Sequence, residues 1–129
     1  MLGGATISWM SKKQSVVALS STEAEYIALS IAGQEATWLR RLLGSLNQNQ
    51  TKETVLYGDN MGAIHLSKNP KDHARTKHID IRFHFIRDML ESGDIILNYI
   101  ESRENVADTF TKPLPRNMFE YLRDSMNLK

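Results

Sequence analysis

A long run with helical periodicity, from about Thr22 to Leu46, constrains the fold of this chain more than any other sequence feature. Two overlapping capping-box patterns, Ser20-x-x-Glu23 and Thr22-x-x-Glu25, lie at its start. The polar run Asn47-Gln48-Asn49-Gln50 marks its end. Apolar residues then recur at helical spacing on one face, at Leu29, Ala32, Ala36, Leu39, Leu43 and Leu46. We therefore predict one long amphipathic helix, which must bury this face against other elements.

Strand-like and helix-like segments alternate along the rest of the chain. We predict strands over 5–10, 15–19, 53–58 and 94–100, and helical segments over 60–67, 79–92, 105–111 and 116–127. This alternation is typical of an α/β layered domain. With 129 residues we expect a single domain over 1–129, in which 112–129 forms a C-terminal tail helix.

Composition excludes several classes of function. The chain has no cysteine, which rules out disulfides, thiol catalysis and cysteine-containing zinc sites. Its formal net charge is +1, so bulk positive charge alone does not explain nucleic-acid binding. No apolar stretch approaches the ~18 residues of a membrane span, and the N-terminus does not resemble a signal peptide. We expect an intracellular protein with no membrane partner.

Three acidic residues lie where strands and helices meet. Glu25 heads the apolar face of the long helix, because five residues of that face lie within about 40° of it at ~100° per residue: Leu29, Ala32, Ala36, Leu39 and Leu43. Asp59 ends the predicted strand 53–58, and Asp108 follows the last strand. Each has an ordinary structural alternative. Glu25 can belong to the capping box and reach solvent, and Asp59 can be a helix N-cap. Asp108 can lie at a helix N-terminus, where its charge complements the helix dipole.

Taken together, the three acids predict a metal site if their junctions converge. Carboxylate oxygens without cysteine suit Mg²⁺ or Mn²⁺ and not zinc. Such clusters support phosphoryl transfer by two metal ions.

Several motifs in a fixed order resemble a known family. They are the segments 8–14 (SWMSKKQ), 17–26 (VALSSTEAEY), 58–60 (GDN), 75–82 (RTKHIDIR) and 105–114 (NVADTFTKPL). Over nearly the whole chain the sequence resembles the ribonuclease H domain of copia-type retrotransposon polyproteins. The resemblance implies a ribonuclease H-like mixed five-stranded sheet with flanking helices, and a parent polyprotein with reverse transcriptase upstream. It also implies a location in a cytoplasmic particle or the nucleus.

The resemblance implies an endonuclease that hydrolyses the RNA strand of RNA–DNA hybrids during reverse transcription. Two Mg²⁺ (or Mn²⁺) ions are held by four carboxylates in the family, and Glu25, Asp59 and Asp108 resemble three of them. The fourth family carboxylate is an Asp on the first strand, upstream of the segment that resembles residues 8–14. No acidic residue precedes Glu23 here. We therefore expect this chain to lack the first strand, most of the second and the fourth carboxylate.

Two consequences follow from the expected lack of a first strand. Nuclease activity should be weak or absent, because the missing carboxylate bridges both metal ions. The exposed sheet edge should favour self-association. The alternative to an impaired nuclease is a catalytically inactive nucleic-acid-binding or interaction remnant of the same fold.

A basic segment from Lys68 to Arg87 carries six Lys or Arg and two acids. Contact with the phosphate backbone is one interpretation, and an ordinary solvated loop and helix face is the other. The candidate substrate-binding residues are Asn60, Arg75, Lys77, His78, Lys12 and Lys13. The aromatic residues Trp9, Trp38 and Tyr99 are predicted to lie in the core.

Overall fold

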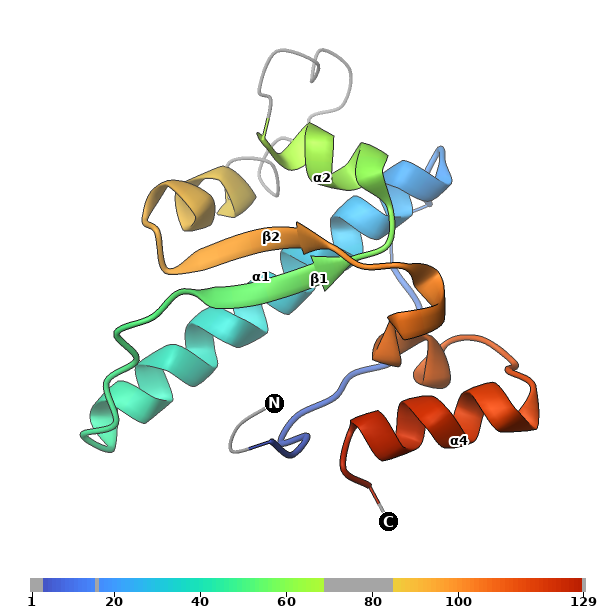
Figure 1. Cartoon of the computed structure of the whole chain (residues 1–129). Helices are drawn as coiled ribbons and strands as arrows, with labels where there is room; N and C mark the ends of the chain where they lie inside the picture. Colours follow the sequence, from blue (N-terminus) through green and yellow to red (C-terminus); the bar gives the residue numbers. More distant parts are fainter. Residues whose placement is uncertain (1–3, 16, 69–84, 129) are drawn as a thin grey trace. The chain divides into compact units, whose positions relative to one another are not determined.

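The computed structural model describes residues 4–15, 17–68 and 85–128, which fall in two compact units (Figure 1). The central unit spans Ala18–Tyr99. The terminal unit combines Met1–Val17 with Ile100–Lys129. The single domain over 1–129 stays a prediction.

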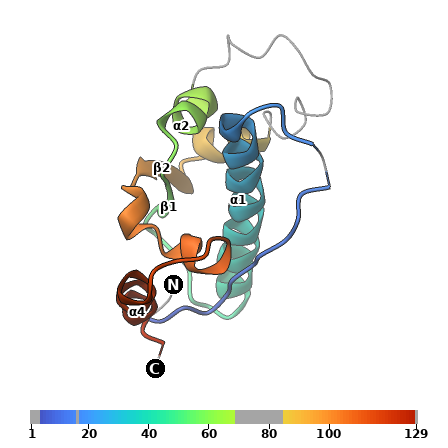
Figure 2. The ribbon, with the colours of Figure 1, turned by 90° about the vertical axis from the view of Figure 1, so that its right-hand side faces the viewer.

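The central unit has a mixed α/β fold, as the alternating sequence pattern predicted. Strands β1 and β2 form a parallel sheet that is in register from Thr54 opposite Ile95 to Gly58 opposite Tyr99. Figure 2 shows α1 running along one side of these strands. The elements are α1 (Ser21–Ser45), β1 (Thr54–Gly58), α2 (Met61–Lys68), a helical segment over 85–91, and β2 (Ile95–Tyr99).

The N-terminus of α1 is capped by the first of the two overlapping patterns. The backbone N–H of Glu23 donates to Ser20 Oγ at 3.1 Å. In return, Glu23 Oε2 accepts from the backbone N–H of Leu19 at 2.6 Å. Glu25 takes no part in this pair of bonds, so Ser20 and Glu23 and not Thr22 and Glu25 form this capping box.

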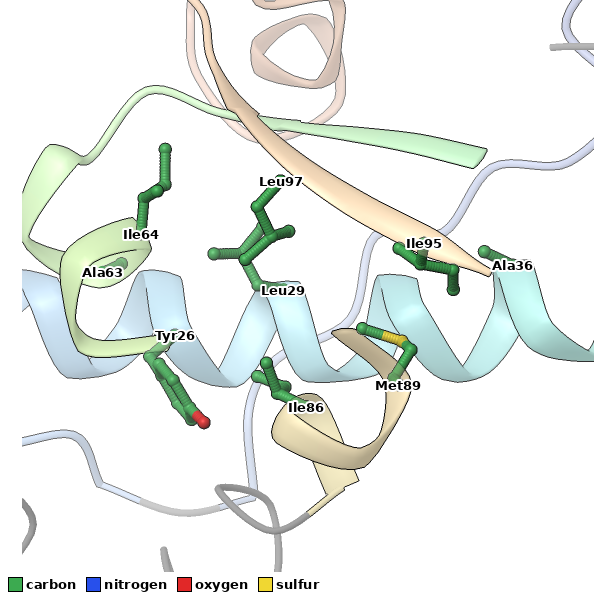
Figure 3. Close-up of a cluster of buried hydrophobic side chains, with 9 residues drawn as sticks. All are labelled: Tyr26, Leu29, Ala36, Ala63, Ile64, Ile86, Met89, Ile95 and Leu97. Carbon is green, nitrogen blue, oxygen red and sulfur yellow. The ribbon is translucent and has the colours of Figure 1, made fainter. Parts of the chain in front are cut away.

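The core lies between the sheet and the helices that cover one of its faces (Figure 3). Alternation along β2 sends Ile95 and Leu97 into the core, while Ile96 faces solvent. A Cβ on Gly33 would lie 2.4 Å from Met89 Sδ, so this glycine allows α1 and the 85–91 helix to approach closely. The buried cluster comprises Tyr26, Leu29, Ala36, Ala63, Ile64, Ile86, Met89, Ile95 and Leu97.

Arg40 connects α1 to the beginnings of both strands. Its Nη1 donates to the Lys52 carbonyl at 2.8 Å and to Thr54 Oγ1 at 3.0 Å. Its Nη2 donates to the Gln50 carbonyl at 3.1 Å and to Asp94 Oδ1 at 2.9 Å. One guanidinium therefore fixes the loop before β1 and the turn before β2.

The terminal unit contains the predicted C-terminal helix and the predicted helical turn. These are α4 (Arg116–Ser125), η3 (Val106–Phe110) and the short η2 (Ser102–Glu104). Leu122 and Met126 are its buried apolar residues. Thr6 binds the Met126 carbonyl through its N–H at 3.4 Å and its hydroxyl at 3.2 Å, which holds the N-terminal segment against the end of α4.

Two predicted strands are wrong. Residues 5–10 form only an isolated bridge at Ala5, and no residue of 15–19 that the structure describes is in a strand. Both segments have suitable side chains, but a strand also needs a hydrogen-bonded neighbour. The sheet therefore has two strands within the described residues, and the five-stranded sheet stays a prediction. Of the predicted helix 79–92, residues 85–91 are helical and 79–84 lie outside the described residues.

The predicted burial of three aromatic residues is also wrong. Trp9 is 66% exposed, Trp38 55% and Tyr99 49%. Trp38 lies on the opposite side of α1 from the face that meets the sheet, and Tyr99 ends β2 beyond the buried residues. Within the described ranges, no helix combines the length and the apolar character needed to cross a membrane.

Ser30 gives a first testable result. Its hydroxyl is fully buried on α1 and has no hydrogen-bond partner among the residues that the structure describes. We expect Ser30→Ala to leave the free energy of unfolding unchanged or to raise it by up to about 1 kcal/mol, since alanine favours helix and removes an unpaired polar atom. Urea denaturation measures this. A loss above about 1 kcal/mol would show that the hydroxyl makes a stabilising bond in solution.

Candidate functional site

Two of the three predicted acids, Glu25 and Asp59, lie at one junction in the central unit. A Cβ on Gly62 would be 3.2 Å from Thr22 Oγ1, and a Cβ on Gly58 would be 3.5 Å from Leu29 Cδ2. Thr22 and Leu29 lie about one turn on either side of Glu25 and share its helix face. The chain from Gly58 to Gly62 therefore crosses α1 at Glu25. We call Glu25 and Asp59 the carboxylate pair.

The carboxylate pair lies in partly buried surroundings near two helix N-termini. Both residues are half-buried. Glu25 lies in the second turn of α1, and Asp59 lies directly before α2, so both are near the positive ends of helix dipoles. The neighbouring Tyr26 is buried, and burial raises the pKa of its phenol. Tyr26 thus stays neutral and adds no further negative charge.

Asn60, and not Asp59, caps α2. Its Oδ1 accepts from the backbone N–H of Ala63 at 3.0 Å, and its carbonyl accepts from Ile64 N–H at 3.2 Å. The structural alternative for Asp59, an N-cap, is therefore filled by the next residue. Asn60 remains a predicted substrate contact, but its side-chain oxygen already accepts the capping hydrogen bond from Ala63.

The cap makes a prediction for Asn60. We expect Asn60→Ala to lower the free energy of unfolding by about 1 kcal/mol, because an N–H of the first turn of α2 loses its acceptor. Asn60→Asp is the matched control and should stay near the unchanged chain, since aspartate also caps. Thermal and urea unfolding compare the three proteins. Equal losses for the alanine and aspartate variants would show that capping is not what Asn60 contributes.

Asp108 belongs to the terminal unit, where it is buried in η3. Lys112 Nζ lies 2.9 Å from Asp108 Oδ2. Asn105 provides the side-chain cap of η3, through its Oδ1 and the N–H of Ala107 at 3.3 Å. Asp108 is therefore a buried carboxylate paired with a half-exposed ammonium group. Sequence reasoning overlooked Lys112, although its four-residue spacing from Asp108 in a helical turn was a readable signal.

The residues fit a hard cation by their chemistry. Among the residues that the structure describes, no three acidic or histidine side chains gather closely enough to hold a metal ion. Mg²⁺, however, is commonly bound by one or two protein carboxylates together with waters and substrate phosphates. The carboxylate pair meets that requirement, and the convergence of all three acids stays a prediction.

Only some of the predicted cationic contacts lie within the residues that the structure describes. Lys12 and Lys13 are exposed in the terminal unit. Arg75, Lys77 and His78 lie outside the described residues, as does most of the basic segment from Lys68 to Arg87.

Comparison with known proteins gives the origin of the chain. It is 50% identical over 125 residues to the retrovirus-related Pol polyprotein from transposon TNT 1-94 of Nicotiana tabacum, covering 97% of this chain and 9% of that protein. The homologues of this chain are retrotransposon Pol polyproteins. The polyprotein from transposon RE1 of Arabidopsis thaliana is 44% identical over 119 residues, or 92% of this chain and 8% of its own length. The Ty1-NL2 Gag-Pol polyprotein of Saccharomyces cerevisiae is 32% identical over 126 residues, or 95% of this chain and 7% of its own length.

The chain thus corresponds to less than a tenth of each of these polyproteins. The predicted retrotransposon origin is confirmed, while the assignment to one domain of the polyprotein stays a prediction. No family model matches the sequence, and no solved structure matches it.

Proposed function

We propose that this chain is a ribonuclease H-type domain of a copia-type retrotransposon Pol polyprotein, and that it acts on the RNA strand of RNA–DNA hybrids. The observation that carries the proposal is the carboxylate pair, since Glu25 and Asp59 lie on neighbouring segments at the end of β1, near the N-termini of two helices. The similarity to Pol polyproteins supports it, because the resemblance implies a reverse transcriptase upstream in the parent polyprotein, whose activity would form such hybrids.

Glu25, Asp59 and Asp108 are the proposed ligands of Mg²⁺ or Mn²⁺. The structure supports Glu25 with Asp59, and the resemblance adds Asp108. When bound, the metal would supply electrostatic activation of water and stabilisation of the leaving oxygen. The protein contributes half-buried carboxylates, Glu25 and Asp59, that lie near the N-termini of α1 and α2. Lys112 neutralises Asp108 and preserves its position in η3.

Cleavage of a labelled hybrid tests the proposal. The 129-residue chain should cleave weakly or not at all, because it carries three of the four carboxylates of the family site. A second protein would place before Met1 the segment of the TNT 1-94 polyprotein that directly precedes its matched 125 residues. We expect this fusion to cleave the RNA strand of the hybrid in Mg²⁺ or Mn²⁺, and to leave duplex DNA intact.

The cleavage experiment has two contradicting outcomes. Rates for the 129-residue chain that equal those of the fusion would show that a fourth carboxylate is not needed. A fusion that folds, binds the hybrid and still leaves it intact would count against an enzyme. That result would favour the second candidate function, a nucleic-acid-binding remnant, for which the lack of a three-acid cluster among the described residues is the supporting observation.

Self-association is a further part of the proposal. In the described part of the sheet, β1 and β2 each have a strand neighbour on one side only. Exposed strand edges pair readily with other chains. We expect the 129-residue chain to form dimers or larger species at high concentration, as measured by light scattering after size separation. A strictly monomeric chain at all concentrations would contradict this expectation.

A further inference from the structure

The segment from Trp9 to Lys13 in the terminal unit combines an exposed aromatic side chain with two exposed cations. Trp9 is 66% exposed, and Lys12 and Lys13 are exposed as well. The segment is held in place, since Ser11 Oγ donates to the Phe110 carbonyl at 3.1 Å. Phe110 ends η3, the element that carries Asp108. We propose that this segment is a nucleic-acid contact in which Trp9 stacks on an unpaired base and the two lysines bind phosphates.

The charge pattern of the terminal unit supports phosphate binding at this segment. Its other described cations are already paired with carboxylates: Arg103 with Glu101, Lys112 with Asp108, Arg116 with Glu120 and Arg123 with Asp124, at 2.7–2.9 Å. Among the described cations of this unit, Lys12 and Lys13 alone have no ion pair. These two ammonium groups are therefore available to phosphate without breaking an internal bond.

Trp9 supplies a contact to a base, which the two lysines do not provide. Phosphate contacts hold a nucleic acid in position without distinguishing its form. An exposed indole adds a stacking surface for a base that is not already stacked in a duplex. Along an extended chain, Trp9 and Lys12 are separated by about 10 Å, so base and backbone contacts can be made together. A nucleic acid with an unpaired base next to a hybrid is thus the ligand that this segment fits best.

This inference rests on the proposed function and extends it to a defined contact. It places the substrate beside Asp108, because Ser11 and Asp108 are both held on η3. It also separates two roles, since the lysines should bind any strand and Trp9 should respond to an unpaired base.

Binding without metal ions tests the inference. In a Trp38→Phe background Trp9 is the only tryptophan. The probes are a blunt RNA–DNA hybrid and the same hybrid with a single-stranded extension, in EDTA so that no cleavage occurs. We expect the extended hybrid to quench Trp9 fluorescence. Trp9→Ala should weaken binding of the extended hybrid about tenfold and of the blunt hybrid little.

The lysines are tested by salt dependence. Lys12→Gln with Lys13→Gln should weaken binding of both probes and reduce the slope of log K against log salt by about 1.8, which is two phosphate contacts at ~0.9 each. Lys52→Gln, an exposed lysine of the central unit, is the matched control and should leave the slope unchanged.

Each outcome supports or contradicts a separate statement. Hybrid binding that is unaffected by the Trp9 and lysine variants would overturn this inference and leave the proposed function intact. Loss of binding in the lysine variant without any Trp9 quenching would overturn the stacking contact. Failure of the unchanged chain to bind either probe would contradict both the inference and the proposed function. Since all three side chains are exposed, circular dichroism should show the variants folded.

Discussion

Glu25→Gln and Asp59→Asn are each expected to lower the rate of Mg²⁺-dependent hybrid cleavage by at least about 100-fold in the fusion that carries the upstream segment. Each change keeps the shape of the side chain and removes one negative charge from the carboxylate pair. Metal assistance in hydrolysis is worth several kcal/mol, and each 1.36 kcal/mol is a factor of ten in rate. Hybrid binding should persist, because the proposed phosphate contacts are cationic residues elsewhere.

The control for these variants is Glu53→Gln. Glu53 lies just before β1, at the opposite end of that strand from Asp59, and is exposed. The Glu53→Gln substitution removes one negative charge from the same unit and leaves the carboxylate pair unchanged. Cleavage by this variant should match the unchanged fusion. Equal losses in all three variants would indicate an effect of net charge, and no loss in any of them would remove Glu25 and Asp59 from the site.

Arg40→Met is expected to lower the free energy of unfolding by about 2–4 kcal/mol. Its guanidinium makes four hydrogen bonds, and its side chain is only 15% exposed. Hydrogen bonds to charged groups contribute about 1.5–3 kcal/mol each, but the exposed acceptors regain bonds to water when Arg40 is removed. Methionine keeps the apolar stem, so the loss reports the bonds and not the packing. Urea denaturation provides the measurement.

Two further variants separate the parts of this network. Arg41→Met changes the neighbouring, exposed arginine and should alter stability by no more than about 0.5 kcal/mol. Asp94→Asn removes the one ionic partner, which is 61% exposed, and should cost less than about 1 kcal/mol. If Asp94→Asn were as damaging as Arg40→Met, the ion pair and not the backbone carbonyls would hold the turn.

Local patterns predicted most of the central unit. The helical period predicted the extent of α1 and the burial of Leu29 and Ala36, but Ala32 and Leu46, which belong to the predicted face, are exposed. The inward Ile95 and Leu97 of β2 follow from period-two alternation in the same way. Asp59 could be placed at a strand end because Gly58 ends the strand before it and Asn69-Pro70 ends the helix that follows it.

The errors concern partners distant in the sequence. Trp38 is apolar and 55% exposed, whereas Ile27, which lies within about 20° of it around α1 at ~100° per residue, is fully buried. Residues 5–10 have the alternation of a strand without a ladder partner in the described part of the molecule. Residue type alone indicated burial in both cases, whereas burial depends on what lies opposite.

The site was predicted in part for the same reasons. The positions of Glu25 near the start of α1 and of Asp59 directly after β1 follow from the local sequence pattern. The assignment of the α2 cap to Asn60 and not to Asp59 needed hydrogen-bond geometry, since either side chain can cap. The four hydrogen bonds of Arg40 join residues up to 54 positions apart, and no local sequence pattern predicts them.

The central claim is that Glu25 and Asp59 bind one metal ion, and titration of the isotope-labelled 129-residue chain with Mn²⁺ tests it most directly. Paramagnetic broadening of backbone amide signals reports where the ion binds. The account predicts broadening centred on Glu25 and Asp59, and its loss in a Glu25→Gln/Asp59→Asn double variant. Broadening confined to exposed acids such as Glu101 and Glu104, or unchanged in the double variant, would contradict the account.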